Sequence, residues 1–249
     1  LGIVSSIGND CREVLNALSQ NQHGFERVDF YEGEDCPIKV AGTIKGFSFP
    51  STNYLQWRAP EGRKIPRTLA RGLPPHGFYC YCALEEALED AGLDVAELAD
   101  TRTGLYCASA GSPYLQKEFL NEMDRHKGSR GNPMGVVSTI SGTLNFNFSN
   151  YLGIRGSNCG FVSACSSSAH AIGAAMDEIR LGRQDRIIVL AGEDVQKETV
   201  LPFGGMRALT TNADPHLASR PFDREASGFV ASGGGVCLIL EAADTLPDR

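Results

Sequence analysis

Residues 160–173 read Gly-Phe-Val-Ser-Ala-Cys-Ser-Ser-Ser-Ala-His-Ala-Ile-Gly, which sets Cys165 between an extended segment and a helix of small residues. Small or apolar residues continue at helical spacing as far as Leu181-Gly182, where a glycine can end the helix. Unpaired N–H groups and the positive end of the helix dipole favour a thiolate at such a helix start, and they can bind an oxyanion beside it. The pattern predicts a nucleophile, and a buried inert thiol is the alternative.

This stretch, continued by Ile-Arg-Leu-Gly-Arg-Gln-Asp at 179–185 and Ile-Ile-Val-Leu-Ala-Gly-Glu-Asp at 187–194, resembles the active-cysteine region of the β-ketoacyl-acyl carrier protein synthases, above all their synthase I-like members. Further blocks match the family in order. They are Leu-Gly-Ile-Val-Ser-Ser-Ile-Gly at 1–8, Arg63-Lys64 with Arg67, Ala-Leu-Glu-Glu-Ala-Leu-Glu-Asp-Ala-Gly-Leu at 83–93, Arg-Ala-Leu-Thr at 207–210, and Pro-Phe-Asp then Gly-Phe-Val within 221–230. Together the blocks span nearly the whole chain.

The resemblance implies an α/β fold, the thiolase-like layered αβαβα sandwich, of which this chain would form mainly the N-terminal half. We expect residues 1–249 to be an incomplete N-terminal β-ketoacyl synthase domain. The short first strand of the family and its C-terminal half are expected to be absent. That half carries the family's two catalytic histidines, its active-site lysine and its Gly-Phe-Gly-Gly-Thr-Asn loop.

The hydrophobic pattern independently predicts alternating strands and helices, and hence a mostly parallel sheet with helices on each side. Asp10 is expected to cap a helix whose apolar stripe is Cys11, Val14, Leu15 and Leu18. Further helices are expected near 77–91, 112–131 and 133–152. The apolar runs that begin at 104, 187 and 236 predict buried strands.

Composition excludes several classes of protein. With 249 residues, 42% hydrophobic content and a formal net charge of −7, the chain can bury a sizeable core and does not suit nucleic-acid binding. No apolar run reaches the roughly 20 residues of a membrane span. The eight scattered cysteines suggest reduced thiols in a cytoplasmic protein, with no metal site. The condensing chemistry implied by the resemblance needs no cofactor.

Two basic clusters stand out on this acidic chain. Arg58, Arg63, Lys64, Arg67 and Arg71 form one, and Arg125, Lys127 and Arg130 form the other. Local positive patches suggest an acidic partner, while a solvated charged surface is the alternative. The resemblance implies that Arg63, Lys64 and Arg67 contact the acidic helix of acyl carrier protein, and we extend this carrier-binding role to Lys127 and Arg130.

The remaining candidates concern the acyl chain and a possible base. The resemblance sets four residues beside an apolar acyl tunnel, with ordinary core packing as the alternative: Gly111, Ile140, Phe203 and Met206. His170 lies five residues after Cys165, about 140° around the helix, so we expect a structural role for it. We expect the other four histidines, His23, His76, His126 and His216, on the surface.

The resemblance implies an acyltransferase of fatty acid biosynthesis, a 3-oxoacyl-acyl carrier protein synthase. Cys165 would take an acyl group from one carrier, and decarboxylating Claisen condensation with malonyl-carrier would follow. The full-length protein is expected to be a homodimer that binds no nucleic acid and no membrane, and the fragment alone is expected to be inactive. Two alternatives stay open, namely a polyketide-type ketosynthase and a non-catalytic partner resembling a chain-length factor.

Overall fold

A five-stranded mixed sheet forms the centre of the computed structural model, which describes residues 1–31 and 35–243. The strand order is β1-β7-β6-β4-β5, with β1 at Gly2–Val4, β4 at Thr103–Ala108, β5 at Asn158–Phe161, β6 at Arg186–Glu193 and β7 at Gly234–Glu241. β4 runs parallel to β5 and β6, whereas β7 runs antiparallel to β6 and β1. The prediction of a mostly parallel sheet is therefore wrong for this side of the sheet, because β7 returns directly beside β6 in the opposite direction.

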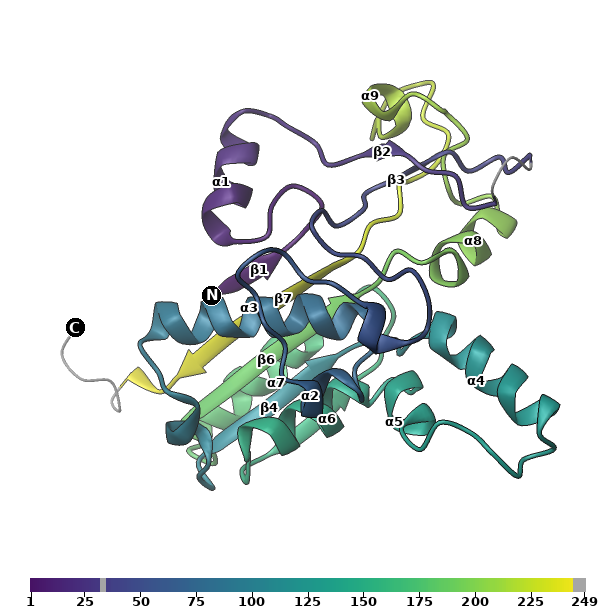
Figure 1. The fold of residues 1–249 in the computed structure, drawn as a ribbon. Coiled ribbons are helices and arrows are strands. Elements are labelled where there is room, and N and C mark those ends of the chain that lie inside the picture. Colours follow the sequence, from purple (N-terminus) through teal and green to yellow (C-terminus); the bar gives the residue numbers. More distant parts are fainter. Residues whose placement is uncertain (32–34, 244–249) are drawn as a thin grey trace.

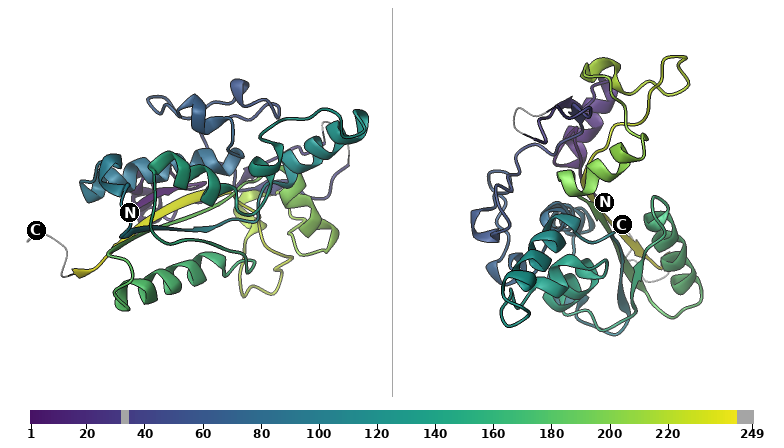
Figure 2. Two further views of the ribbon diagram at one scale, coloured as in Figure 1. Left: turned by 90° about the horizontal axis from the view of Figure 1, so that it is seen from below. Right: turned by 90° about the vertical axis from the view of Figure 1, so that its right-hand side faces the viewer.

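Helices cover both faces of the sheet (Figure 2). α3 (Pro75–Ala91) and α6 (Thr143–Leu152) lie on one face, and α7 (Ser167–Arg180) lies on the other. Along β6, Ile188 and Leu190 join the core beneath α3 and α6, while Ile187 and Val189 join the core beneath α7. The apolar run of this strand is thus buried on both faces, as predicted.

The remaining helices and strands lie around this sandwich. α1, β2, β3, α8 and α9 gather toward one end of the sheet (Figure 1). Their bounds, with those of the other short elements, are α1 Cys11–Ser19, β2 Glu26–Arg27, β3 Val40–Ala41, η1 Tyr54–Gln56, α2 Arg67–Ala70, η2 Val95–Leu98, α4 Pro113–Arg125, α5 Gly135–Thr139, α8 Lys197–Gly205 and α9 Pro215–Ala218. Among the described residues, no helix is long and apolar enough to cross a membrane.

The first helix begins where predicted but buries a different face. The Asp10 carboxylate accepts a hydrogen bond of 2.6 Å from the backbone N–H of Glu13, which confirms the cap. Val14 is buried, whereas Leu15 and Leu18 are 66% and 58% exposed. The predicted apolar stripe is therefore wrong at these two leucines, since α1 meets the rest of the described chain along one narrow side only.

The single helix predicted over 133–152 is two helices, α5 and α6. Ile140 ends α5 in an extended conformation. The carbonyl of Thr139 accepts a hydrogen bond of 3.0 Å from the N–H of Ser112, in the turn after β4. A tertiary contact thus takes the carbonyl that a continuous helix would use, and a pattern of small apolar residues does not reveal it.

α3 lies in backbone contact with the sheet because three strands present glycine to it. A Cβ added at Gly2 of β1 would lie 1.8 Å from the carbonyl oxygen of Ala83, and one at Gly235 of β7 would lie 2.6 Å from the carbonyl carbon of Tyr79. At Gly192 of β6, an added Cβ would lie 2.4 Å from the sulfur of Cys80. This close approach brings the N-terminal end of α3 to the carboxyl end of β6.

Candidate active site

Cys165 lies at the edge of the sheet where the parallel strands β4, β5 and β6 reach their carboxyl ends. It follows β5 and precedes the first residue of α7, Ser167, with Ser166 as the N-cap. The carboxyl edge of a parallel sheet is a usual place for a reactive centre, because the loops there converge. The predicted position of Cys165 at a helix start is confirmed.

The turn that presents Cys165 is strained, and serine hydroxyl groups hold it. Ala164 adopts φ +51°, in the left-handed region that residues with a side chain seldom occupy. The N–H of Ser163 donates to Oγ of Ser167 at 2.8 Å, and that hydroxyl donates to the carbonyl of Ala164 at 2.7 Å. Ser166 Oγ donates to the carbonyl of Ser163 at 2.7 Å. The first turn of α7 therefore fixes the turn that carries the cysteine.

His170 contacts the same turn through a different atom. Its Nδ1 lies 2.7 Å from Oγ of Ser163, a hydrogen bond whose donor depends on the tautomer of the ring. His170 itself is exposed on the first half of α7. This bond to the residue two positions before the cysteine supports the structural role expected for His170.

Exposure separates the candidate nucleophile from most of the other thiols. Cys165 and Cys159 are exposed, Cys11 is half-buried, and the five buried cysteines are Cys36, Cys80, Cys82, Cys107 and Cys237. Burial raises the pKa of Cys82 and of Cys237 to about 12, and it raises the pKa of Cys80 and of Cys107 well above the ordinary value. These four thiols are therefore protonated at neutral pH, and Cys159 is the exposed thiol against which Cys165 can be compared.

The four residues predicted to line the acyl tunnel form two groups. Gly111, with φ +86°, is buried against the end of α5, where an added Cβ would lie 2.9 Å from the carbonyl carbon of Ile140. Phe203 lies in α8, and Met206 caps the end of that helix and is 73% exposed. Phe203 packs edge-on against Phe229, with ring centroids 5.7 Å apart. Ile140, Phe203 and Met206 are all exposed, so the described residues do not close a tunnel around them.

The predicted carrier-binding residues lie in two exposed segments. Lys64 and Arg67 are exposed before and at the start of α2, whereas Arg63 is half-buried and pairs with Glu85 at 3.7 Å. Lys127 and Arg130 are exposed in the turn after α4. Within residues 1–31 and 35–243, Lys64, Arg67, Lys127 and Arg130 have no ion-pair partner, so their charges face solvent.

A buried polar cluster that the sequence did not reveal lies at the same edge of the sheet. His76 of α3, predicted to be on the surface, is fully buried between Ser109 after β4 and Asp194 after β6. The prediction is wrong because α3 begins at Pro75, with Pro74 as its N-cap, and the helix carries His76 over the sheet. The prolines were the available signal, since proline is common at the first position of a helix.

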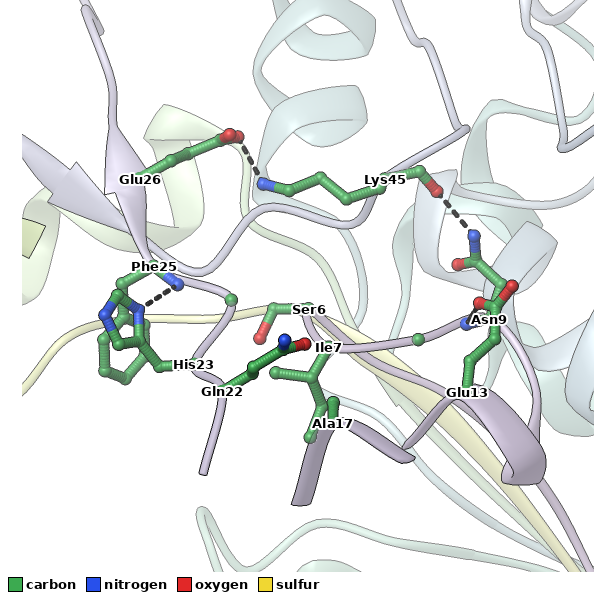
Figure 3. A pocket seen from close by; sticks show the side chains of 12 residues that line it. Ser6, Ile7, Asn9, Glu13, Ala17, Gln22, His23, Phe25, Glu26 and Lys45 are labelled. Carbon is green, nitrogen blue, oxygen red and sulfur yellow. Dashed lines mark hydrogen bonds and ion pairs between the residues drawn. The ribbon is translucent and has the colours of Figure 1, made fainter. Parts of the chain in front are cut away.

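His23, His126 and His216 are exposed as predicted, and His23 borders a cavity of about 300 Å³ (Figure 3). His23 lines this cavity together with residues from the segment 6–9, α1, β2 and Lys45. His23 Nε2 lies 2.8 Å from Nδ1 of His216 in α9. None of the residues predicted for the active site lines this cavity.

Comparison with known families gives one match along almost the whole chain. The family profile described as the N-terminal domain of β-ketoacyl synthases matches residues 1–245. The chain is 35% identical over 247 residues to 3-oxoacyl-acyl-carrier-protein synthase 1 of Haemophilus influenzae, covering 96% of this chain and 57% of that protein. It is 32% identical over 246 residues to the enzyme of the same name in Escherichia coli, covering 97% and 57%. The chain thus spans a little over half the length of these relatives.

Solved structures give the same picture of the fold. The chain matches a crystal structure of a β-ketoacyl synthase from Burkholderia phymatum with a TM-score of 0.80 and 26% identity, covering 98% of this chain and 58% of that one. It also matches the ishigamide ketosynthase/chain length factor with a TM-score of 0.76, but at 20% identity this second likeness concerns the fold alone. The expected thiolase-like α/β fold, in its N-terminal half, is confirmed.

Proposed function

This chain belongs to the β-ketoacyl synthase family, and from that membership we propose that the complete protein is a decarboxylating condensing enzyme with Cys165 as its nucleophile. The observation that carries the proposal is the exposed Cys165 on a strained, hydroxyl-braced turn at the start of α7. The positive end of the helix dipole at the start of α7 suits both a thiolate and a neighbouring oxyanion, while the N–H groups of Ser166 and Ser167 donate to the carbonyls of Ser163 and Ala164. The relatives named 3-oxoacyl-acyl-carrier-protein synthase 1 support the same activity.

The proposed reaction has two stages. The Cys165 thiolate attacks the carbonyl carbon of an acyl thioester on acyl carrier protein, and the carrier's phosphopantetheine thiol leaves. A malonyl group on a second carrier molecule then loses carbon dioxide. The resulting enolate attacks the Cys165 thioester, the carbon–sulfur bond breaks, and 3-oxoacyl-carrier and free Cys165 remain. The family resemblance assigns stabilisation of the enolate to two histidines that match no histidine of this chain.

We further propose that acyl carrier protein docks on basic residues of two segments, Arg63, Lys64 and Arg67 in one and Lys127 and Arg130 in the other. Except for Arg63, which pairs with Glu85, their charges face solvent on a chain with a formal net charge of −7, which favours a specific acidic partner over general anion binding. The acyl chain would extend past Gly111, Ile140, Phe203 and Met206. The part of the complete protein that corresponds to the rest of the relatives' length would cover these residues and close the tunnel. A closed tunnel would stabilise the bound acyl chain, because burying each of its CH₂ groups contributes about 0.8 kcal/mol.

The proposal extends to the assembly. Residues 1–249 would form the N-terminal part of one β-ketoacyl synthase domain in a cytoplasmic homodimer. β5 supports the homodimer, because it is an edge strand whose exposed residues leave one side open to pairing. Fatty acid synthesis is favoured over a polyketide pathway, since three relatives at 32–35% identity are named 3-oxoacyl-acyl-carrier-protein synthase 1.

The direct test is acyl loading of the complete protein. Incubation with acyl-carrier should add one acyl group to the peptide that contains Cys165, and Cys165→Ala should remove this adduct. Cys159→Ala is the matched control and should load normally, because Cys159 lies on β5 outside the turn. Acylation elsewhere, or unchanged 3-oxoacyl product from Cys165→Ala, would contradict the assignment.

A further inference from the structure

We propose that His76, through Ser109 and Asp194, is a positioning residue that holds the two walls of the acyl-chain pocket and thereby sets the preference for acyl length. The inference rests on the proposed function. It concerns a buried cluster at the carboxyl edge of the sheet, where the same edge carries Cys165. None of the three residues is assigned a part in the chemistry at the cysteine.

The cluster has a defined geometry. His76 Nε2 lies 2.8 Å from Oγ of Ser109, within hydrogen-bond distance. On the other side of the ring, Nδ1 lies 3.8 Å from Oδ2 of Asp194, and both side chains are completely buried. His76 Nδ1 and Asp194 Oδ2 have no hydrogen-bond partner in the described residues. The imidazole therefore bridges the ends of β4 and β6.

Stability alone does not account for this arrangement. Burying a carboxylate beside an imidazole has a large desolvation cost, and well-packed apolar side chains of similar volume are often as stable or more stable. Two unpaired buried polar atoms add to that cost. The polar groups instead fix the orientation of the loops that follow β4 and β6, because a hydrogen bond depends on direction and an apolar contact does not.

The first wall of the acyl-chain pocket is the turn that contains Gly111, together with Ile140, and it is held in place through Ser109. Its hydroxyl oxygen accepts a hydrogen bond of 3.0 Å from the backbone N–H of Gly111. Gly111 has φ +86°, and an added Cβ would lie 2.4 Å from the carbonyl oxygen of Thr139. The turn after β4 is thus pressed against the end of α5, where Ile140 follows. A shift of Ser109 would move Gly111 and Ile140 together.

The second wall of the pocket is α8, with Phe203 and Met206, and it is held in place through Asp194. Its Oδ1 accepts hydrogen bonds from Oγ1 of Thr199 at 2.6 Å and from the N–H of Gln196 at 3.2 Å. Gln196 is the N-cap of α8, the helix that carries Phe203 and ends at Met206. The buried imidazole of His76 therefore lies between Ser109, which accepts a hydrogen bond from the Gly111 turn, and Asp194, which accepts hydrogen bonds from the start of α8.

The order Ser109–His76–Asp194 is also that of a hydrolase triad, but the geometry favours positioning. Ser109 is 6% exposed, and its oxygen is already hydrogen-bonded by Gly111. The separation of 3.8 Å between His76 and Asp194 exceeds a hydrogen bond. The serine therefore lacks both access and an oriented base, whereas Cys165 is exposed.

The test compares acyl donors of different length in the complete protein. The variants are His76→Leu, which keeps bulk without polarity, Ser109→Ala, and His76→Gln, which can still reach Ser109. His23→Gln, at an exposed histidine outside the cluster, is the matched control. For each protein we would measure kcat/KM with hexanoyl- and dodecanoyl-carrier, the rate of Cys165 alkylation, and labelling by a fluorophosphonate.

We expect His76→Leu and Ser109→Ala each to lower the dodecanoyl/hexanoyl ratio of kcat/KM about tenfold, since small displacements of positioning groups have effects of this order. The double variant should show no larger shift than either single variant. Cys165 alkylation should stay within about twofold. His76→Gln should retain most of the original ratio, and His23→Gln should retain all of it.

Three results would overturn the inference. One is an equal loss at both chain lengths with slower Cys165 alkylation, which would mean general damage to the fold. Another is an unchanged ratio in the folded Ser109→Ala variant, and the third is fluorophosphonate labelling of Ser109. Failure of the proposed function itself is distinguishable, because unsubstituted protein would then show no condensation with either donor.

Discussion

Hydroxyl groups, rather than neighbouring charges, hold the turn that carries Cys165. Ser166 and Ser167 each donate a side-chain hydrogen bond to a carbonyl of the two residues before the cysteine, and these bonds offset the strain at Ala164. A run of serines after the cysteine would by itself slightly favour the polyketide-type alternative, but two of the three serines here have a local structural reason. The serine run is therefore weak evidence for a polyketide pathway over fatty acid synthesis.

Selective alkylation tests the consequence for Cys165. In the complete protein we expect iodoacetamide to modify Cys165 about tenfold faster than Cys159, because only Cys165 combines exposure with a helix start. The buried thiols should react last. Peptide mapping by mass spectrometry gives the rates, and prior acylation should protect Cys165 alone. Equal labelling of both exposed cysteines would contradict the assignment.

Glu193, beside Asp194, gives a prediction about pH. Burial raises the pKa of the Glu193 carboxyl above its usual range and, with the charge of Asp194, outweighs the lowering by His76 and by the hydrogen bond from the Asp194 N–H. The folded state therefore favours the protonated form, and the contribution of Glu193 to stability is lost as the pH rises above about 4.3. Glu193→Gln should raise Tm at pH 7 and have little effect near pH 4. Glu89→Gln, at an exposed position of α3, is the control and should change Tm at neither pH.

The helix α3 depends on glycine in three strands for its close contact with the sheet. Gly2, Gly192 and Gly235 come from distant parts of the chain, yet each faces the backbone or a side chain of this helix. The helix itself was predictable from its apolar pattern and from Gly92, which ends it with φ +62°. Its depth on the sheet was not, because that depth depends on residues that precede or follow it by tens of positions or more.

Substitution at Gly235 measures this contact. A valine there would place atoms within 2.6 Å of the Tyr79 carbonyl carbon, so we expect Gly235→Val to lower the free energy of unfolding by at least about 1–3 kcal/mol. Gly173→Ala in α7 is the control, because nothing lies within 4 Å of an added Cβ there. It should raise stability by about 0.5–1 kcal/mol. Denaturant titration of the complete protein gives both values, and equal effects would refute the close approach.

The basic segment around α2 makes a separate prediction. Lys64→Glu with Arg67→Glu should weaken carrier binding about tenfold at low salt and flatten its salt dependence, because both charges face solvent. Arg12→Glu, at an exposed arginine of α1, should leave carrier affinity nearly unchanged. Calorimetry with acyl-carrier measures the affinity. Unaltered binding by the double variant would mean that these residues form an ordinary charged surface with no role in carrier binding.

The molecule as a whole exposes apolar side chains near the proposed tunnel, among them Ile140, Phe203, Met206 and Phe229. We expect the 249-residue chain alone to form no 3-oxoacyl product and to bind a hydrophobic dye, because these groups lack a cover and no donors for the enolate are matched. A chain extended to the length of the relatives should lose the dye binding and gain turnover. Normal turnover by the short chain would overturn this division of roles.

The sequence predicted those helices and strands whose formation depends on neighbouring residues alone. The apolar run of β6, the spacing in α7 and the cap at Asp10 were sufficient for those elements, and the family motif made Cys165 the candidate nucleophile. The buried state of His76 was missed, since it depends on the path of α3 over the sheet. Ser109 and Asp194 were missed for a related reason, because single polar residues after strands become a cluster only once β4 and β6 are paired.

The pairing of β1 with β7 has a consequence for biosynthesis. Gly2 lies opposite Cys237, so the first strand of the chain has its partner among the last residues described. At about 5–20 residues per second, a ribosome needs on the order of 10–50 s to make the intervening chain. Throughout that time β1 lacks the strand that pairs with it among the described residues, and α3, which packs against both strands, lacks its contacts with β7. In a nascent chain the edge of β1 that pairs with β7 therefore stays open until β7 emerges.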